Sequence, residues 1–286
     1  MESNEADISL LVVILDTNPS QKIIRKNAHA MTQCIDAVVA FGNTHLMQKS
    51  QNKLAVIACH HSVTEFLYPT AGKLEVRQVD GQYEIFTLVE KTVKHRLAEL
   101  INSAPRIVQP CESLLAGSIS MALAYIARVN RNKSVGMRLS SRILIVTGSN
   151  ECASQYMTYM NVFFTAQKQG VTIDVCALDK SLSLLQQGTD ITGGQYLKLP
   201  QLDGVLQYLL WVFLPDHQTR DKLVLPPASK VDYRAACFCH RELIDIGYVC
   251  SVCLSIFCKI TPICGTCQTV FKNSAPIREK KKRTIK

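Results

Sequence analysis

Cysteine is concentrated in one short stretch near the end of this 286-residue chain. Seven of the twelve cysteines lie between Cys237 and Cys267, and two pairs among them have the spacing C-x2-C. Two cysteines with this spacing can reach one tetrahedral ion together, and two such pairs supply the four thiolates that suit zinc. The sequence therefore predicts a zinc site formed by Cys250, Cys253, Cys264 and Cys267.

The other ligand-type residues of this stretch leave the number of metal ions open. Cys237, Cys239, His240 and Cys258 would alternate along the chain with the first set, in the manner of a cross-braced RING domain. The third ligand group would then be the single Cys258 instead of a C-x2-C pair, which departs from the RING pattern. Two interpretations follow: one zinc with the other cysteines packed nearby, or two zinc ions.

Four thiolates around one zinc leave no open position for water, so this metal is expected to be structural and not catalytic. A module of about 40 residues rarely buries enough surface to fold alone, and zinc binding supplies the missing free energy. Tyr248, Phe257 and Phe271 are candidates for a small core around the metal. The scattered Cys34, Cys59 and Cys176 lie in apolar runs and are expected to be buried thiols.

Catalytic motifs are wanting elsewhere in the chain. The sequence has no G-x-x-x-x-G-K-[ST] phosphate loop, no G-x-G-x-x-G fingerprint and no G-x-S-x-G nucleophile elbow. The adjacent pair His60 and His61 is expected to be partly exposed without a ligand role, and the other histidines outside the cysteine stretch are far apart. We therefore expect no enzymatic activity.

The first three quarters of the chain alternate between apolar runs and helical patterns. Uninterrupted Val/Ile/Leu strands of this kind indicate a mostly parallel sheet covered by helices on both faces, so the fold class is a doubly wound α/β domain. Helices are expected over 20–41, 90–102, 114–129, 153–169, 181–187 and 202–214. Strands are expected over 9–16, 53–60, 65–68, 83–89, 142–147, 171–178 and 195–199. Gly42 is expected to end the first helix, and Ser113 to cap the third.

The predicted organisation is an α/β domain over 1–214, a linker over 215–231, a zinc module over 232–272 and a basic tail over 273–286. The net charge is +9, and the last nine residues carry six basic residues and one acidic residue, so the remainder is only weakly basic. Such a tail is typical of an import signal or a nucleic-acid contact, or is a solvated end. The N-terminus lacks the pattern of a signal peptide, and the longest apolar runs are too short to span a membrane, so we expect a soluble intracellular protein.

The first strand ends in the sequence D-x-N-x-S at Asp16, Asn18 and Ser20. This resembles the D-x-S-x-S loop of von Willebrand factor A domains, whose oxygen ligands help to hold Mg²⁺. The segment I-T-G-G-Q-Y from Ile191 also resembles that family, and Ser113 stands where the family has a threonine ligand. However, Asn18 replaces a serine, and the strand over 142–147 continues without the family's Asp-Gly loop. We expect Asp16 to cap a turn and not to bind Mg²⁺.

A more specific resemblance covers nearly the whole chain. The strings CIDAV from Cys34, KLAVIA from Lys53, LQYLLWVFLP from Leu206, VDYRAACFCH from Val231 and GYVCSVC from Gly247 are similar to the small subunits of the TFIIH core that join a von Willebrand-A domain to a zinc finger. The resemblance implies a non-catalytic nuclear scaffold that acts in nucleotide excision repair and in RNA polymerase II initiation. It also implies, as partner, the larger TFIIH subunit that joins a von Willebrand-A domain to a RING-like finger.

Two other classes of function are compatible with the zinc module. A RING-type ubiquitin ligase would need a complete cross-brace, and a zinc-dependent nucleic-acid-binding protein would need a dense basic stripe. The stretch 237–271 includes Glu242 and Asp245 among its basic residues, so it is not strongly cationic. Protein binding is therefore the preferred function of the module.

Overall fold

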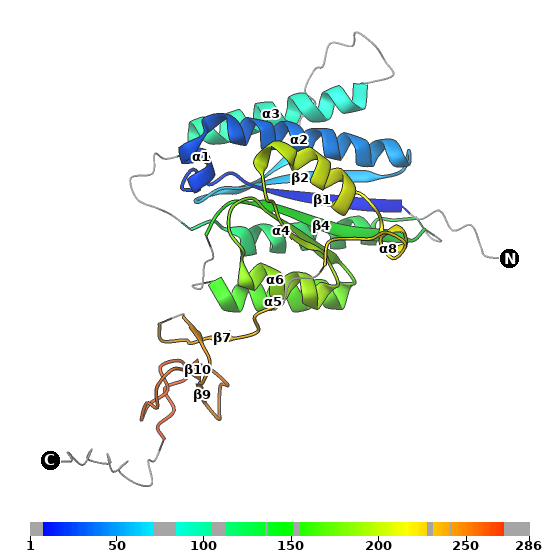
Figure 1. The fold of residues 1–286 in the computed structure, drawn as a ribbon. Coiled ribbons are helices and arrows are strands. Elements are labelled where there is room, and N and C mark those ends of the chain that lie inside the picture. The colour runs from blue at the N-terminus through cyan, green and yellow to red at the C-terminus, as the bar shows by residue number, and fades with distance from the viewer. Residues whose placement is uncertain are drawn as a thin grey trace. The chain divides into compact units, whose positions relative to one another are not determined.

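The computed structural model describes residues 8–70, 84–104, 112–134, 137–150, 155–227, 231–240 and 242–271 (Figure 1). The chain divides into two units, 1–232 and 233–286. Among the described residues, no helix is both long and apolar enough to cross a membrane.

The first unit is built on a six-stranded sheet with the order β3-β2-β1-β4-β5-β6. Its strands are β1 (Ile8–Asp16), β2 (Lys53–Cys59), β3 (Thr64–Tyr68), β4 (Leu139–Thr147), β5 (Thr172–Ala177) and β6 (Tyr196–Lys198). All neighbouring pairs are parallel except β2 with β3, which are antiparallel. The predicted doubly wound, mostly parallel α/β fold is therefore confirmed.

Helices cover both faces of this sheet (Figure 1). One face carries α2 (Ala28–Gln48), α3 (Glu84–Ser103) and α7 (Val205–Tyr208). A 3-10 turn (Leu202–Gly204) precedes α7, and a π-helical segment (Leu209–Phe213) follows it. The other face carries α4 (Leu115–Arg131), α5 (Tyr156–Gln169) and α6 (Ser183–Thr192). The short helices α1 (Lys22–Lys26) and α8 (His217–Arg220) lie at the ends of the sheet.

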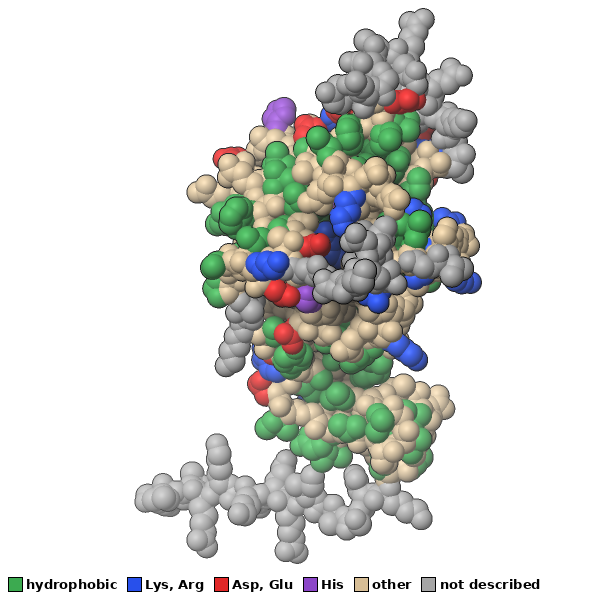
Figure 2. All heavy atoms as spheres, turned by 90° about the vertical axis from the view of Figure 1, so that its right-hand side faces the viewer, with side chains coloured by type: hydrophobic (Ala, Val, Ile, Leu, Met, Phe, Trp, Pro, Cys, Tyr) green, Lys and Arg blue, Asp and Glu red, His purple; other side chains and the backbone are tan. Residues whose placement is uncertain are grey.

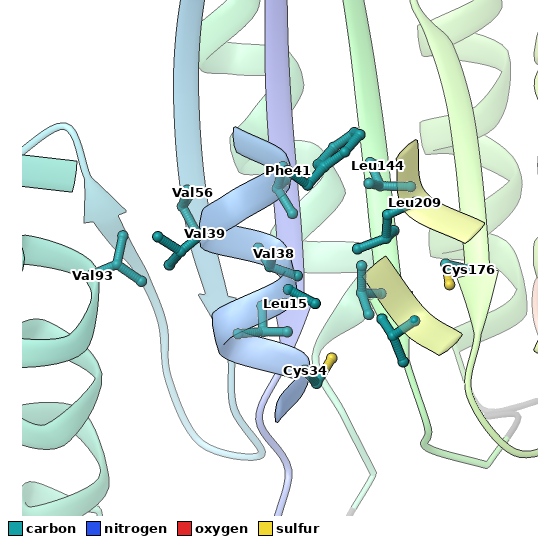
Figure 3. Close-up of a cluster of buried hydrophobic side chains, with 14 of the residues drawn as sticks. Leu15, Cys34, Val38, Val39, Phe41, Val56, Val93, Leu144, Cys176 and Leu209 are labelled. Atoms are coloured by element: carbon teal, nitrogen blue, oxygen red, sulfur yellow. The ribbon is translucent and has the colours of Figure 1, made fainter. Parts of the chain in front are cut away.

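Alternate residues of β1 divide between two cores because successive strand side chains point to opposite faces. Leu11, Val13 and Leu15 pack against buried residues of α2, α3 and the 205–213 segment. Leu10, Val12 and Ile14 pack against α4, α5 and α6. Figure 3 shows the first core, with side chains from α2 pointing toward β1 and β4.

Two sequence-based boundaries are wrong. Residues 84–89, expected to be a strand, form the start of α3, whose buried residues Val89, Val93, Leu97 and Leu100 recur three or four positions apart. Helix α2 does not stop at Gly42 but continues to Gln48. A Cβ atom at position 42 would lie 2.8 Å from a methyl of Leu54, so this glycine permits close helix–sheet packing instead of ending the helix.

The end of the α/β unit also differs from the sequence-based expectation. Residues 217–220, expected in a linker, form α8, and Arg220 is buried against Asp174 of β5. Arg142 of β4 donates hydrogen bonds to the carbonyl oxygens of Phe213, Leu214 and Pro215. These contacts hold the residues that follow the 205–213 segment against the sheet.

The turn after α6 supplies a testable packing constraint at Gly194. A Cβ atom added at Gly194 would lie only 1.9 Å from the carbonyl oxygen of Ile173, a backbone atom that cannot rotate away. We expect Gly194→Ala to lower the free energy of unfolding by about 1–3 kcal/mol, the usual cost of overpacking. Gly117→Ala is the matched control, because nothing lies within 4 Å of its Cβ position in α4, and should stabilise by about 0.5–1 kcal/mol. Denaturant unfolding measures both changes in the free energy of unfolding. Equal changes for the two variants would show that the contact with Ile173 does not restrict position 194.

The second unit has little regular structure. It contains two antiparallel two-stranded sheets, one of β7 (Ala235–Ala236) with β8 (Leu243–Ile244), the other of β9 (Tyr248–Val249) with β10 (Ile256–Phe257). Strands of two residues cannot hold a fold by their own hydrogen bonds. The unit therefore depends on its side-chain clusters.

Candidate metal centre

The four cysteines predicted to share one zinc come together in the second unit. Their sulfur atoms all lie within 4.8 Å of one another. The Sγ atoms of Cys250 and Cys267 are 3.7 Å apart, and those of Cys253 and Cys264 are 3.5 Å apart. Four thiolates at zinc–sulfur bonds of about 2.3 Å would be roughly 3.8 Å apart in a tetrahedron, so the set fits zinc.

Each C-x2-C pair forms a tight turn with the same backbone pattern. In the first, the N–H of Leu254 donates to the carbonyl of Cys250, and the N–H of Cys250 donates to the carbonyl of Ser255. In the second, Gln268 and Thr269 make the equivalent bonds with Cys264. The residue after each second cysteine takes a positive φ, 58° at Leu254 and 59° at Gln268. The repeated geometry brings both cysteines of each pair to one side of their turn.

A hydroxyl group next to each pair was not predicted from the sequence. The Ser255 oxygen lies 3.2 Å from the Sγ of Cys253, and the Thr269 oxygen lies 3.1 Å from the Sγ of Cys267. The hydrogen bond between Cys253 and Ser255 lowers the pKa of Cys253 to about 6, which favours the thiolate that binds metal. The signal in the sequence is a Ser or Thr two residues after each C-x2-C pair.

The second ligand set also comes together. The ligand atoms of Cys237, Cys239, His240 and Cys258 lie within 4.8 Å of one another. The Sγ of Cys258 is 3.3 Å from the Sγ of Cys239 and 3.2 Å from the Nδ1 of His240. Hydrogen bonds from Cys258 lower the pKa of Cys239 to about 7. Three thiolates and one imidazole fit tetrahedral zinc.

The two clusters alternate along the chain, so the first and third ligand groups meet in one and the second and fourth in the other. A backbone bond links the first ligand group to the chain just before Cys258, because the N–H of Phe238 donates to the carbonyl of Ile256. Within the first ligand group, the N–H of Cys237 donates to the carbonyl of Glu242. The lone Cys258, which departs from the RING pattern in sequence, takes the place of a cysteine pair in space. The arrangement of the two clusters is that of a cross-brace.

The small core around the cysteines is partly as expected. Phe257 is buried with Cys250 and Cys264, and Phe238 and Phe271 pack against them. Tyr248, expected in this core, is instead exposed on β9. In a strand of only two residues, the alternation of side chains does not show which residue faces the core. The sequence therefore could not predict whether Tyr248 is buried or exposed.

The thiols of the α/β unit are separate from both clusters. Cys34, Cys59 and Cys176 are buried as predicted, and burial raises the pKa of Cys34 and of Cys59 to about 12. His60 is also buried, which corrects the expected partial exposure, and burial lowers its pKa to about 4. Cys111 and Cys152 lie outside the described residues.

The loop that resembles a Mg²⁺ site forms a hydrogen-bond network around a single carboxylate. Asp16 accepts bonds from the hydroxyls of Ser113 and Thr147, at 3.0 and 2.6 Å, and from the N–H of Asn18. Ser113 also bonds to Asn18 and Ser149, so it is part of this network and not a helix cap. The expected turn is present, because Asp16 bonds the backbone two residues ahead.

Replacing Asp16 by asparagine is expected to raise the free energy of unfolding at neutral pH. Burial raises the pKa of Asp16, so the folded state binds the proton more tightly than the unfolded state does. The bound proton therefore stabilises the folded wild-type protein. This stabilisation is complete below the unfolded-state pKa of Asp16 and is lost as pH rises through its folded-state pKa. The advantage of Asp16→Asn should therefore be small in acid and grow toward neutral pH, as measured by denaturant unfolding at several pH values. The opposite trend, or stabilisation of the wild type by added Mg²⁺, would contradict this account.

Comparisons with known proteins agree on one family. The family described as "Transcription factor Tfb4" matches residues 8–268. The "General transcription and DNA repair factor IIH subunit tfb4" of Schizosaccharomyces pombe is 39% identical over 269 residues, covering 92% of this chain and 89% of that protein. The Arabidopsis thaliana subunit TFB4 is 39% identical over 280 residues, covering 94% and 90%.

A solved structure extends the comparison to the fold. The crystal structure of the TFIIH p34 N-terminal domain superimposes with a TM-score of 0.62 at 28% sequence identity, and the match covers 73% of this chain and 99% of that domain. The α/β unit thus has the von Willebrand-A-like fold that the Asp16 loop and the I-T-G-G segment indicate. On the family match and these relatives, the chain belongs to the transcription factor Tfb4 family.

Proposed function

We propose that this chain is a non-catalytic subunit of the TFIIH core, acting in transcription initiation and nucleotide excision repair through contacts with other subunits. The family match over 8–268 and two relatives named as subunits of a general transcription and DNA repair factor carry the proposal. The proposal includes a nuclear location and, as principal partner, the larger subunit with von Willebrand-A and RING-like domains.

The chemistry of the clusters supports a structural role. Each offers four protein ligands, so a bound zinc would have no position left for water or substrate. When bound, zinc would cross-link segments that are far apart in the sequence. Asp16, the carboxylate in the Mg²⁺-like loop, is engaged by three donors of the protein itself.

The proposed role is tested by purifying the full-length tagged chain from nuclear extract and identifying the co-purifying proteins by mass spectrometry. Recovery of TFIIH helicases and of the RING-bearing subunit in fixed proportion is expected. Recovery of the chain alone would refute the proposal.

We further propose that the module binds two zinc ions, one at Cys250, Cys253, Cys264 and Cys267 and one at Cys237, Cys239, His240 and Cys258. The ligand distances and the alternation of the two sets support two ions. Elemental analysis of the purified chain should give about two zinc ions per molecule, and fewer for Cys258→Ser. A wild-type value of one, unchanged by Cys258→Ser, would leave only the first site.

A second candidate function is ubiquitin transfer, because the cross-braced arrangement is shared with RING domains. A ubiquitin-transfer assay with the full-length chain and a panel of conjugating enzymes decides between the two. Our proposal predicts no stimulation above the conjugating enzyme alone.

A further inference from the structure

The surface of the zinc module is unusually apolar for its size. Half of the exposed large hydrophobic residues in the described part of the chain lie between 233 and 270, although this span holds only about a sixth of the described residues. Figure 2 shows hydrophobic side chains gathered on the visible face of this unit. Exposed apolar patches of this kind mark interaction surfaces on soluble proteins.

One part of this surface is hollowed into a pocket. The pocket has a volume of about 220 Å³ and is lined mainly by Tyr248, Phe257, Ile260 and Phe271. Ligand pockets for small molecules usually have volumes of about 300–1,000 Å³. The observed volume instead suits one apolar side chain inserted from a protein partner, as at the centre of many interfaces.

The pocket also has a distinct charge. Among the described residues, Lys259 is the only charged residue that lines it, and Lys259 makes no ion pair with another of them. In the same unit, the acid Asp245 is paired with Arg234. A carboxylate brought next to the inserted side chain would pair with Lys259, whereas the chain's own basic tail would place like charges together.

We propose that this pocket is a docking site for a partner protein that inserts one apolar side chain next to an acidic residue. The inference rests on the proposed function, since the partner would be another TFIIH subunit. The mainly apolar lining favours protein over nucleic acid, which would require a denser set of cations. Because Cys250 also lines the pocket, its shape depends on the first cysteine cluster.

The test uses a matched pair of substitutions in the full-length chain. Ile260 lines the pocket and is 52% exposed, whereas Ile263 is 53% exposed and does not line it. Ile260→Asp should weaken retention in the reconstituted TFIIH core about tenfold or more, and Ile263→Asp less than about threefold. Lys259→Glu should weaken it as well. Equal zinc content in all variants shows that the module remains folded.

A photo-crosslinker placed at Tyr248 in the assembled core identifies the occupant. A crosslinked peptide of another subunit, with an acidic residue beside an apolar one, supports the proposal. Crosslinks to nucleic acid, to the chain's own tail or to a second copy would overturn it, as would equal effects of Ile260→Asp and Ile263→Asp. If the wild-type chain does not assemble at all, the proposed function fails instead.

Discussion

Replacing Cys250 by serine is expected to release the first zinc and unfold the module over 237–271. Cys250 is buried between Cys267 and the small core of Phe257 and Cys264, so serine would leave both an incomplete ligand set and a poorly filled site. Structural zinc in small modules supplies about 10–16 kcal/mol of apparent binding free energy, which is folding free energy when the apo module is unfolded. Elemental analysis and hydrogen exchange measure the two effects.

The control for this variant is Ser251→Ala, which changes the exposed neighbour of Cys250 and removes no ligand. It should keep its zinc and its exchange protection. In the Cys250→Ser chain, protection should be lost in the second unit and kept in the α/β unit, since the two units are separate in the fold. Full zinc content and unchanged protection in Cys250→Ser would show that Cys250 is not a ligand.

Replacing Arg220 by alanine is expected to lower the free energy of unfolding of the α/β unit by about 3–5 kcal/mol, the usual cost of leaving a buried charge unpaired. Arg220 makes two bonds to the carboxylate of Asp174, at 2.8 and 2.6 Å, with side-chain exposures of only 8% and 2%. Asp174 would retain the bond from the N–H of Gln195. Denaturant unfolding followed by the fluorescence of Trp211, the only tryptophan, measures the change.

An exposed ion pair of the same unit provides the comparison. Arg96 and Glu99 on α3 are 36% and 51% exposed, so Arg96→Ala should cost less than about 1 kcal/mol. Combining Arg220→Met with Asp174→Leu should recover part of the loss, because no charge is then buried alone. An Arg220→Ala loss no larger than that of Arg96→Ala would mean that Asp174 is readily solvated.

The sequence predicted most of the α/β fold because its strands and helices have strong periodic patterns. β1 is an apolar run buried on both faces, and α5 ends at Gly170, which takes the left-handed φ expected of a helix stop. The predictions were wrong where one sequence pattern is compatible with both a strand and a helix. The short apolar run over 83–89 is compatible with a strand, and only packing of Val93, Leu97 and Leu100 against the sheet decides for a helix.

By itself, the sequence determined the two C-x2-C pairs, since two cysteines three positions apart can reach one ion when the chain between them turns. It also determined the alternation of strands and helices, which depends on neighbours along the chain. Only the tertiary structure decided between one cluster and two, by bringing Cys258 to His240, and showed that Arg220 reaches Asp174 across 46 positions. These contacts depend on how distant segments pack, and several packings satisfy the same local pattern. The pocket beside Lys259 has the same origin, because its walls come from residues between 248 and 271 that only the folded module brings together.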